Sequence, residues 1–142
     1  MVNLRMLFNR SAIVLLVFLA SGGTALAREI ASVKIEKSGI IRPESEQTDE
    51  ALLNWCKRFR PTLPQVRRYF SNAVPVPAVV SDHDRYSACA AKGTITFKEG
   101  FRANWFLYSD GSARIDWEAG GHVYLLLKDN KWYDPFGPYD KG

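Results

Sequence analysis

The densest group of reactive side chains lies in the stretch SDHDRYSAC, residues 81–89. Cys89, His83 and Asp84 are the residue types of a nucleophile, a base and the carboxylate that orients the base. Asp82, His83 and Asp84 are also types that ligate metal ions. Neighbouring side chains on an extended chain point in opposite directions, so these three do not converge easily on one ion. We therefore interpret the stretch as a solvated connector, and we expect no catalytic residue, metal ion or cofactor.

A second pair of acids, Asp116 and Glu118, lies on one face of a predicted strand. Paired carboxylates act as acid and base in sugar cleavage. With His83, they support an alternative function as a small hydrolase or as an envelope glycan- or lipid-binding protein. The simpler interpretation is the polar face of a strand. The sequence contains no HExxH, CxxC, GxSxG or phosphate-binding-loop motif, which argues against the enzyme classes that carry them.

The first 27 residues have the three parts of a secretory signal peptide. A basic start with Arg5 and Arg10 precedes the apolar run SAIVLLVFLA, and an Ala-x-Ala sequence ends at Ala27. The run is too short for a comfortable membrane span, which needs roughly 20 apolar residues. We expect cleavage after Ala27 and a periplasmic or secreted chain that begins at Arg28. An uncleaved membrane anchor is the alternative.

Removal of 27 residues from the 142 leaves 115, which is enough for one domain, residues 28–142, but not for two. Cleavage also removes Arg5 and Arg10, so the formal charge falls from +4 to +2. A domain this weakly basic is not a nucleic-acid-binding candidate on bulk charge. All four tryptophans lie in this part, which is typical of a packed domain and not of a disordered one.

Both cysteines, Cys56 and Cys89, belong to the mature part. Exported chains with an even number of cysteines usually pair them, and two cysteines allow one intramolecular pairing. The predicted disulfide closes a loop of about 34 residues and stabilises the fold by ~3.5–4 kcal/mol in the chain-entropy estimate.

The mature chain opens with a short strand and a loop at 28–47, where ASVKIEK alternates in polarity. Residues 48–74 have helical periodicity. Thr48 is the expected N-cap of a first helix that Pro61 ends, and Thr62 begins the capping box of a second helix. The stretch VPVPAVV then predicts an extended connector. The first helix has the apolar stripe Leu52, Leu53, Cys56 and Phe59, and the second has Val66, Tyr69, Phe70 and Ala73.

Residues 86–133 change to a period of two, which is typical of strands. The segments CAAKGTITF, FRANWFL, SARIDWE and HVYLLLK alternate in polarity, and KEG, SDG and AGG separate them as three-residue hairpin loops. They predict an antiparallel meander of four strands, with KWYD as a short fifth piece and residues 134–142 as a tail. The fold class is therefore α+β: two short helices packed on a four- to five-stranded meander, with one disulfide.

The loops also predict a register. With SDG as the second loop, Leu107 faces Ala113, and with AGG as the third, Ile115 faces Leu125. The inner face of the sheet then carries apolar side chains, which the amphipathic helices cover. The outer face carries Tyr108 at one end and two mixed rows, which are Phe106, Arg114 and Leu126, then Asn104, Asp116 and Tyr124.

The outer face is a candidate binding face, because aromatic side chains around an arginine are typical of protein interfaces. Its candidate residues are Phe106, Tyr108, Arg114, Asp116, Tyr124 and Leu126. The alternative is that the N-terminal strand, the VPVP connector or the tail covers this face. A second candidate is a basic cluster on the helices, suited to anionic lipids, anionic glycans or acidic proteins, formed by Lys57, Arg58, Arg60, Arg67 and Arg68.

These observations favour a small exported, non-enzymatic binding protein of the inhibitor or immunity type, which recognises another envelope protein or a foreign protein. The outer face would act by steric occlusion, with Arg114, Tyr108 and Tyr124 as anchors. We expect a protein partner, no nucleic acid and no integral membrane segment after cleavage. A structural envelope component, which contacts the membrane surface through the basic helices, is the third alternative.

Overall fold

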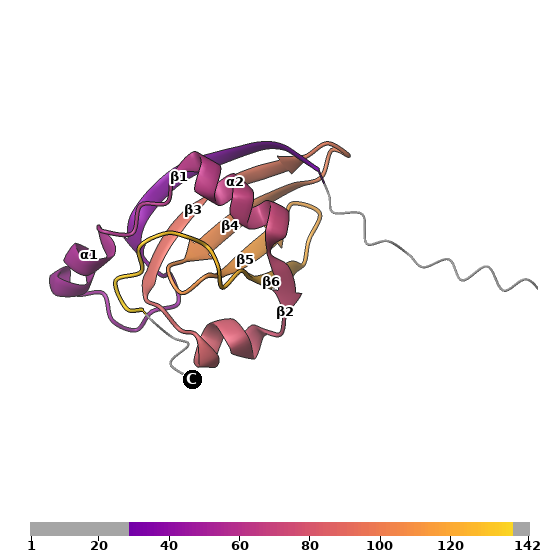
Figure 1. The fold of residues 1–142 in the computed structure, drawn as a ribbon. Helices are drawn as coiled ribbons and strands as arrows, with labels where there is room; N and C mark the ends of the chain where they lie inside the picture. The colour runs from indigo at the N-terminus through magenta and orange to yellow at the C-terminus, as the bar shows by residue number, and fades with distance from the viewer. Residues whose placement is uncertain (1–28, 138–142) are drawn as a thin grey trace, which may run out of the picture.

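The computed structural model describes residues 29–137, so the predicted signal peptide and residues 138–142 of the predicted tail lie outside the described residues. The described chain has an α+β fold in which two α-helices pack on one antiparallel sheet (Figure 1). Its elements, with η1 a turn of π-helix, are β1 (Ile30–Ile41), α1 (Glu50–Cys56), α2 (Leu63–Asn72), β2 (Val74–Val76), η1 (Val80–Asp84), β3 (Cys89–Phe97), β4 (Arg102–Tyr108), β5 (Ser112–Trp117) and β6 (His122–Leu126).

The sheet has six strands in the order β1-β3-β4-β5-β6-β2, and the predicted meander forms β3 to β6. The strand count exceeds the prediction because two flanking segments also pair. β1 continues through SGII, which we expected to be a loop, as far as Ile41 opposite Cys89. The VPV segment, expected to be a connector, forms β2 and pairs with β6. The KWYD segment, residues 131–134, forms no strand.

The hairpin register agrees with the prediction in one turn and differs in the next. Leu107 lies opposite Ala113, as predicted for the β4–β5 hairpin. In the β5–β6 hairpin, Leu125 also lies opposite Ala113, so the predicted pairing of Leu125 with Ile115 is wrong.

A different position of the loop glycines causes this shift. The loop consists of residues 118–120, and Gly121, expected inside the loop, already accepts the Trp117 N–H (3.0 Å). Gly120 has a φ of 105°, a left-handed conformation that glycine adopts without strain. The consequence is that Tyr124 lies opposite Arg114.

The first helix is shorter than predicted. Asp49, not Thr48, is the N-cap of α1, and its carboxylate accepts the Leu52 N–H (2.8 Å). The helix ends at Cys56 because the backbone then tightens: the Phe59 N–H donates to the Cys56 carbonyl, three residues back (2.9 Å).

The second helix begins with the predicted capping box, in which Thr62 and Gln65 exchange two hydrogen bonds. α2 lies across the inner face of the sheet (Figure 1), where Phe70 packs on Trp105 with ring centroids 5.5 Å apart. The capping box and the apolar stripe therefore place the helix as the sequence indicates. Neither α-helix within residues 29–137 is long and apolar enough to cross a lipid bilayer.

Trp105 is fully buried at the centre of the inner face, and its indole N–H donates to the Thr94 carbonyl (3.0 Å). Gly93 on β3 leaves the space that the indole occupies. A Cβ atom at Gly93 would collide with the Lys34 carbonyl oxygen and lie 2.5 Å from Cζ2 of Trp105. Only glycine at this position lets β1 and the Trp105 ring approach together.

The C-terminal segment, residues 127–137, completes the cover of the inner face without regular structure (Figure 1). Trp132 packs its ring against Phe59 and Tyr69, with centroids 5.7 and 5.5 Å away. Its indole N–H also donates to the Ser109 carbonyl (3.0 Å). One aromatic residue thus connects α1's end, α2 and the sheet.

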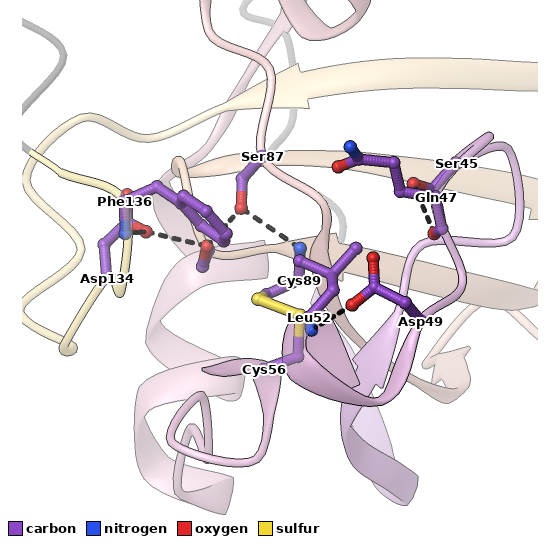
Figure 2. The surroundings of a disulfide bond; sticks show 10 residues. Ser45, Gln47, Asp49, Leu52, Cys56, Ser87, Cys89, Asp134 and Phe136 are labelled. Atoms are coloured by element: carbon purple, nitrogen blue, oxygen red, sulfur yellow. Dashed lines mark hydrogen bonds between the residues drawn. A yellow bond between two sulfur atoms is a disulfide. The ribbon is translucent and has the colours of Figure 1, made fainter. Parts of the chain in front are cut away.

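The predicted disulfide between Cys56 and Cys89 is present, and both residues are fully buried. It joins the last residue of α1 to the first residue of β3 (Figure 2). The Ser87 hydroxyl accepts the Cys89 N–H (3.1 Å), so the strand end beside the bridge is also held by a hydrogen bond.

Candidate binding face

The outer face carries two rows of side chains across β4, β5 and β6. Phe106, Arg114 and Tyr124 form one row and are all half-buried. Leu126 lies opposite Ser112, so its predicted place beside Arg114 is wrong. The neighbouring row consists of Asn104, Asp116 and His122.

Arg114 is fixed in the middle of this face by two carboxylates. Its Nε donates to Oδ1 of Asp116 (2.7 Å), and its Nη1 lies 3.8 Å from Oε1 of Glu44. The Arg114 side chain remains 29% exposed. A charged group held in one orientation, between the two aromatic rings of its row, is suited to a directional contact with a partner.

A buried arginine, which the sequence analysis did not single out, organises one end of the outer face. Arg42 follows β1 directly and is 3% exposed. Its Nη2 donates to Oδ1 of Asp82 (2.8 Å), and its Nη1 donates to the Ser81 carbonyl (3.1 Å). The guanidinium lies 3.9 Å from the centroid of the Tyr108 ring and 4.9 Å from that of Tyr86.

The stretch 81–89, predicted to be a solvated connector, packs against this end of the sheet. The hydroxyls of Ser81 and Ser112 are hydrogen-bonded (3.0 Å), and Arg85 donates to the Asp110 carbonyl (3.1 Å). The side chains of Ser81, Arg85, Ser87 and Cys89 are buried, so much of the stretch is structural. Its exposed members are His83, Asp84 and Tyr86.

Tyr108 is therefore not an exposed anchor. Its side chain is fully buried beneath Arg42, and no hydrogen bond to its hydroxyl exists among the described residues. Burial raises the pKa of the Tyr108 hydroxyl well above its usual value. Strand parity correctly places Tyr108 on the outer face, but no sequence pattern shows that a side chain from residue 42 covers it.

Within residues 29–137, neither the N-terminal strand, nor the VPVP connector, nor the C-terminal segment covers the central row. β1 and β2 pair at the two edges of the sheet, and residues 127–137 pack on its inner side. Phe106, Arg114 and Tyr124 therefore remain partly exposed. Within residues 29–137, the three segments that we considered as a cover for this face do not lie over this row.

The residues considered for chemistry are not brought together. Cys89 is in the disulfide and has no free thiol. Asp116 accepts from Arg114, whereas Glu118 is exposed in the β5–β6 loop and His83 is exposed on η1. Within residues 29–137, no group of three or more His, Cys, Asp or Glu side chains is placed to hold a metal ion.

The five residues of the basic cluster all contact other groups of the domain, some in their own turn and some far away in the sequence. Arg67 donates to the Ile30 carbonyl (2.8 Å), and Arg68 donates to the Asp129 carbonyl (2.9 Å). Arg58 stacks over the Trp55 ring, while Lys57 and Arg60 bond within their own turn. Lys57, Arg58 and Arg60 follow the end of α1, and all five residues of the cluster are exposed.

Comparisons with protein-family models, with curated protein sequences and with solved structures find no match for this chain. The inference about function therefore depends on the geometry of the outer face.

Proposed function

We propose that this chain is an exported, non-enzymatic binding protein of the inhibitor or immunity type, which recognises another protein through the outer face of its sheet. Phe106, Arg114 and Tyr124 form the centre of the contact, and Asp116 and Leu126 lie beside them. The observation that carries the proposal is the partial exposure of this row on a sheet whose other face is covered by α2 and the C-terminal segment.

The two edge strands argue that a partner binds to the outer face and does not add a strand to the edge of the sheet. β2 carries Pro75, which has no N–H to donate to an added strand. β1 carries Lys34 and Lys37, and Arg67 already binds the Ile30 carbonyl at its start. Lysine and proline on edge strands are the usual protection against pairing with another chain. A partner therefore contacts side chains on the face more readily than backbone at an edge.

Export is part of the same proposal. A fully buried disulfide is typical of proteins that mature in an oxidising compartment. The predicted signal peptide would direct the chain to such a compartment. The domain would act by steric occlusion: a rigid cross-linked sheet covers a functional surface of the partner, and no group on the domain has to react.

The test is a capture experiment with matched variants. The oxidised domain from Arg28 to Gly142 is immobilised, exposed to envelope extract, and the retained protein is purified for affinity measurement. Tyr124→Ala and Arg114→Ala should each weaken binding about 30-fold, because central interface residues contribute about 2 kcal/mol or more. Their melting temperatures should stay close to that of the wild type.

Tyr133→Ala is the control, because Tyr133 is 57% exposed on the C-terminal segment and lies outside the outer face. It should bind as the wild type does. Equal losses in Tyr133→Ala and Tyr124→Ala, or unchanged binding in both outer-face variants, would exclude the outer face. The absence of any stoichiometric protein partner would contradict the proposed function itself.

A further inference from the structure

A polar groove of about 450 Å³ lies on the outer face where β1, β3 and β4 run side by side. The strand register gives the groove two neighbouring cross-strand pairs of side chains: Lys34 pairs with Thr94, and Ser32 pairs with Thr96. The groove is lined by Ser32, Lys34, Thr94, Thr96, Arg102 and Asn104, with Glu118 at its margin. It lies beside the row that the proposed function uses, since Asn104 and Phe106 are on the same face of β4.

These side chains have unused hydrogen-bonding capacity. Within residues 29–137, no hydrogen bond or ion pair uses the charged group of Lys34 or Arg102, or the side-chain amide of Asn104. All three residues are exposed. They stand on strands in the middle and at one edge of a rigid sheet, so their spacing is set before any ligand arrives.

The uncompensated charge at this end of the outer face is positive. Lys92 adds a third cation on β3 without a partner among the described residues, and Glu118 is the one acidic residue among those that line the groove. At the opposite end the charges are already paired, because Glu44 and Asp82 both bind Arg42. The groove therefore offers free cations, whereas the far end of the face offers neutralised ones.

We propose that this groove receives carboxylate side chains of the protein partner, so that the partner presents an acidic segment to the outer face. This inference rests on the proposed function and specifies the chemistry of its partner. Lysine and arginine supply the charge, and the neighbouring hydroxyl and amide groups supply neutral donors around the carboxylate oxygens. Complementary charge of this kind also speeds the encounter of two proteins and makes it sensitive to salt.

The probe is a hexaglutamate peptide, titrated into the ¹⁵N-labelled oxidised domain at low ionic strength. Saturable shifts are expected at the amides of β1, β3 and β4 that border the groove. The double variant Lys34→Gln/Arg102→Gln should bind the peptide about tenfold more weakly, because it removes two exposed cations that line the groove. Both substitutions are at exposed positions, so the spectrum of the free variant should remain that of the folded domain.

The matched control is Lys57→Gln/Arg58→Gln, which removes two cations from the basic cluster at the end of α1. It should leave the affinity unchanged. Shifts confined to the helices, with the loss of affinity in this control, would overturn the inference, as would the absence of any saturable shift. A hexagalacturonate titration serves as the glycan arm: groove shifts with the sugar and none with the peptide would replace the acidic protein by an acidic glycan.

If the peptide does not bind in the groove, the proposed function is still tested by the capture experiment. Capture of a partner whose binding depends on Tyr124 does not require that the partner have an acidic segment. Capture with salt-independent affinity and no response to Lys34→Gln/Arg102→Gln would retain the binding protein and remove the charge complementarity.

Discussion

Asp110 shows how one residue can set the pH dependence of this fold. It is 1% exposed in the β4–β5 loop, and its Oδ1 accepts the Ser112 N–H (2.6 Å). Its Oδ2 has no hydrogen-bond partner among the described residues. Burial raises the pKa of this carboxyl from 3.8 to about 6, against the lowering effect of the bonds from Ser112. At neutral pH, the domain therefore holds a buried negative charge that is incompletely solvated.

The sign of the pH effect follows from this raised pKa. The folded state binds the Asp110 proton more tightly than the unfolded chain does, so the contribution of Asp110 to stability is most favourable below pH 4 and is lost as the pH rises through about 6. Two pKa units correspond to about 3 kcal/mol. Asp110→Asn keeps an acceptor for Ser112 and removes the charge, so it should raise the free energy of unfolding at pH 7 by up to about that amount.

The measurement is urea unfolding of the wild type and Asp110→Asn at several pH values from 4 to 8. The difference between the two proteins should grow from about pH 4 to about pH 7 and then stay constant, because all other titrating groups are shared. Parallel profiles would mean that the pKa of Asp110 is the same in the folded and unfolded states, and would contradict the prediction.

Arg42 marks the limit of prediction at the residue scale. The periodicities of the strands placed Tyr108 and Arg114 on the outer face correctly, because side-chain direction follows from strand parity alone. Arg42 lies between the end of β1 and Pro43, in a segment that has no period. Its burial depends on Tyr86 and Tyr108, which come more than 40 residues later. A contact over that separation leaves no local signal.

At the scale of elements, the irregular segment 127–137 acts as part of the core. Trp132→Ala should lower the free energy of unfolding by about 3 kcal/mol, because removal of a large packed aromatic leaves a cavity beside Phe59 and Tyr69. Trp55→Ala is the control: Trp55 is 47% exposed, and its loss should cost less than about 1 kcal/mol. Urea unfolding of both variants checks the pair; equal losses would show that the segment does not close the core.

The elements with a regular pattern were predictable, and those held by distant contacts were not. The meander and α2 follow from alternation, glycine loops and a capping box, all of which are local. β2 is too short for a recognisable period and exists because β6 lies beside it. The shift in the β5–β6 hairpin came from two adjacent glycines, either of which can take the left-handed position at the end of a three-residue loop.

At the scale of the whole molecule, the disulfide joins the helical layer to the sheet. The double variant Cys56→Ala/Cys89→Ala should lose about 3.5–4 kcal/mol of unfolding free energy, since the bridge closes a loop across a sequence separation of 33 residues. Chemical denaturation of the variant, and of the wild type with and without reductant, measures the loss. A change below about 1 kcal/mol would mean that packing alone holds α1 in place.

The strand order has a consequence for the order in which the chain can assemble. β1 leaves the ribosome before any other strand, yet its partner in the sheet is β3. Val33, for example, cannot pair until Ile95 has been synthesised. The hairpins from β3 to β6 are made of close neighbours and need no such delay. β1 therefore stays unpaired until β3 has been synthesised, and until then its alternating apolar side chains have no sheet to join.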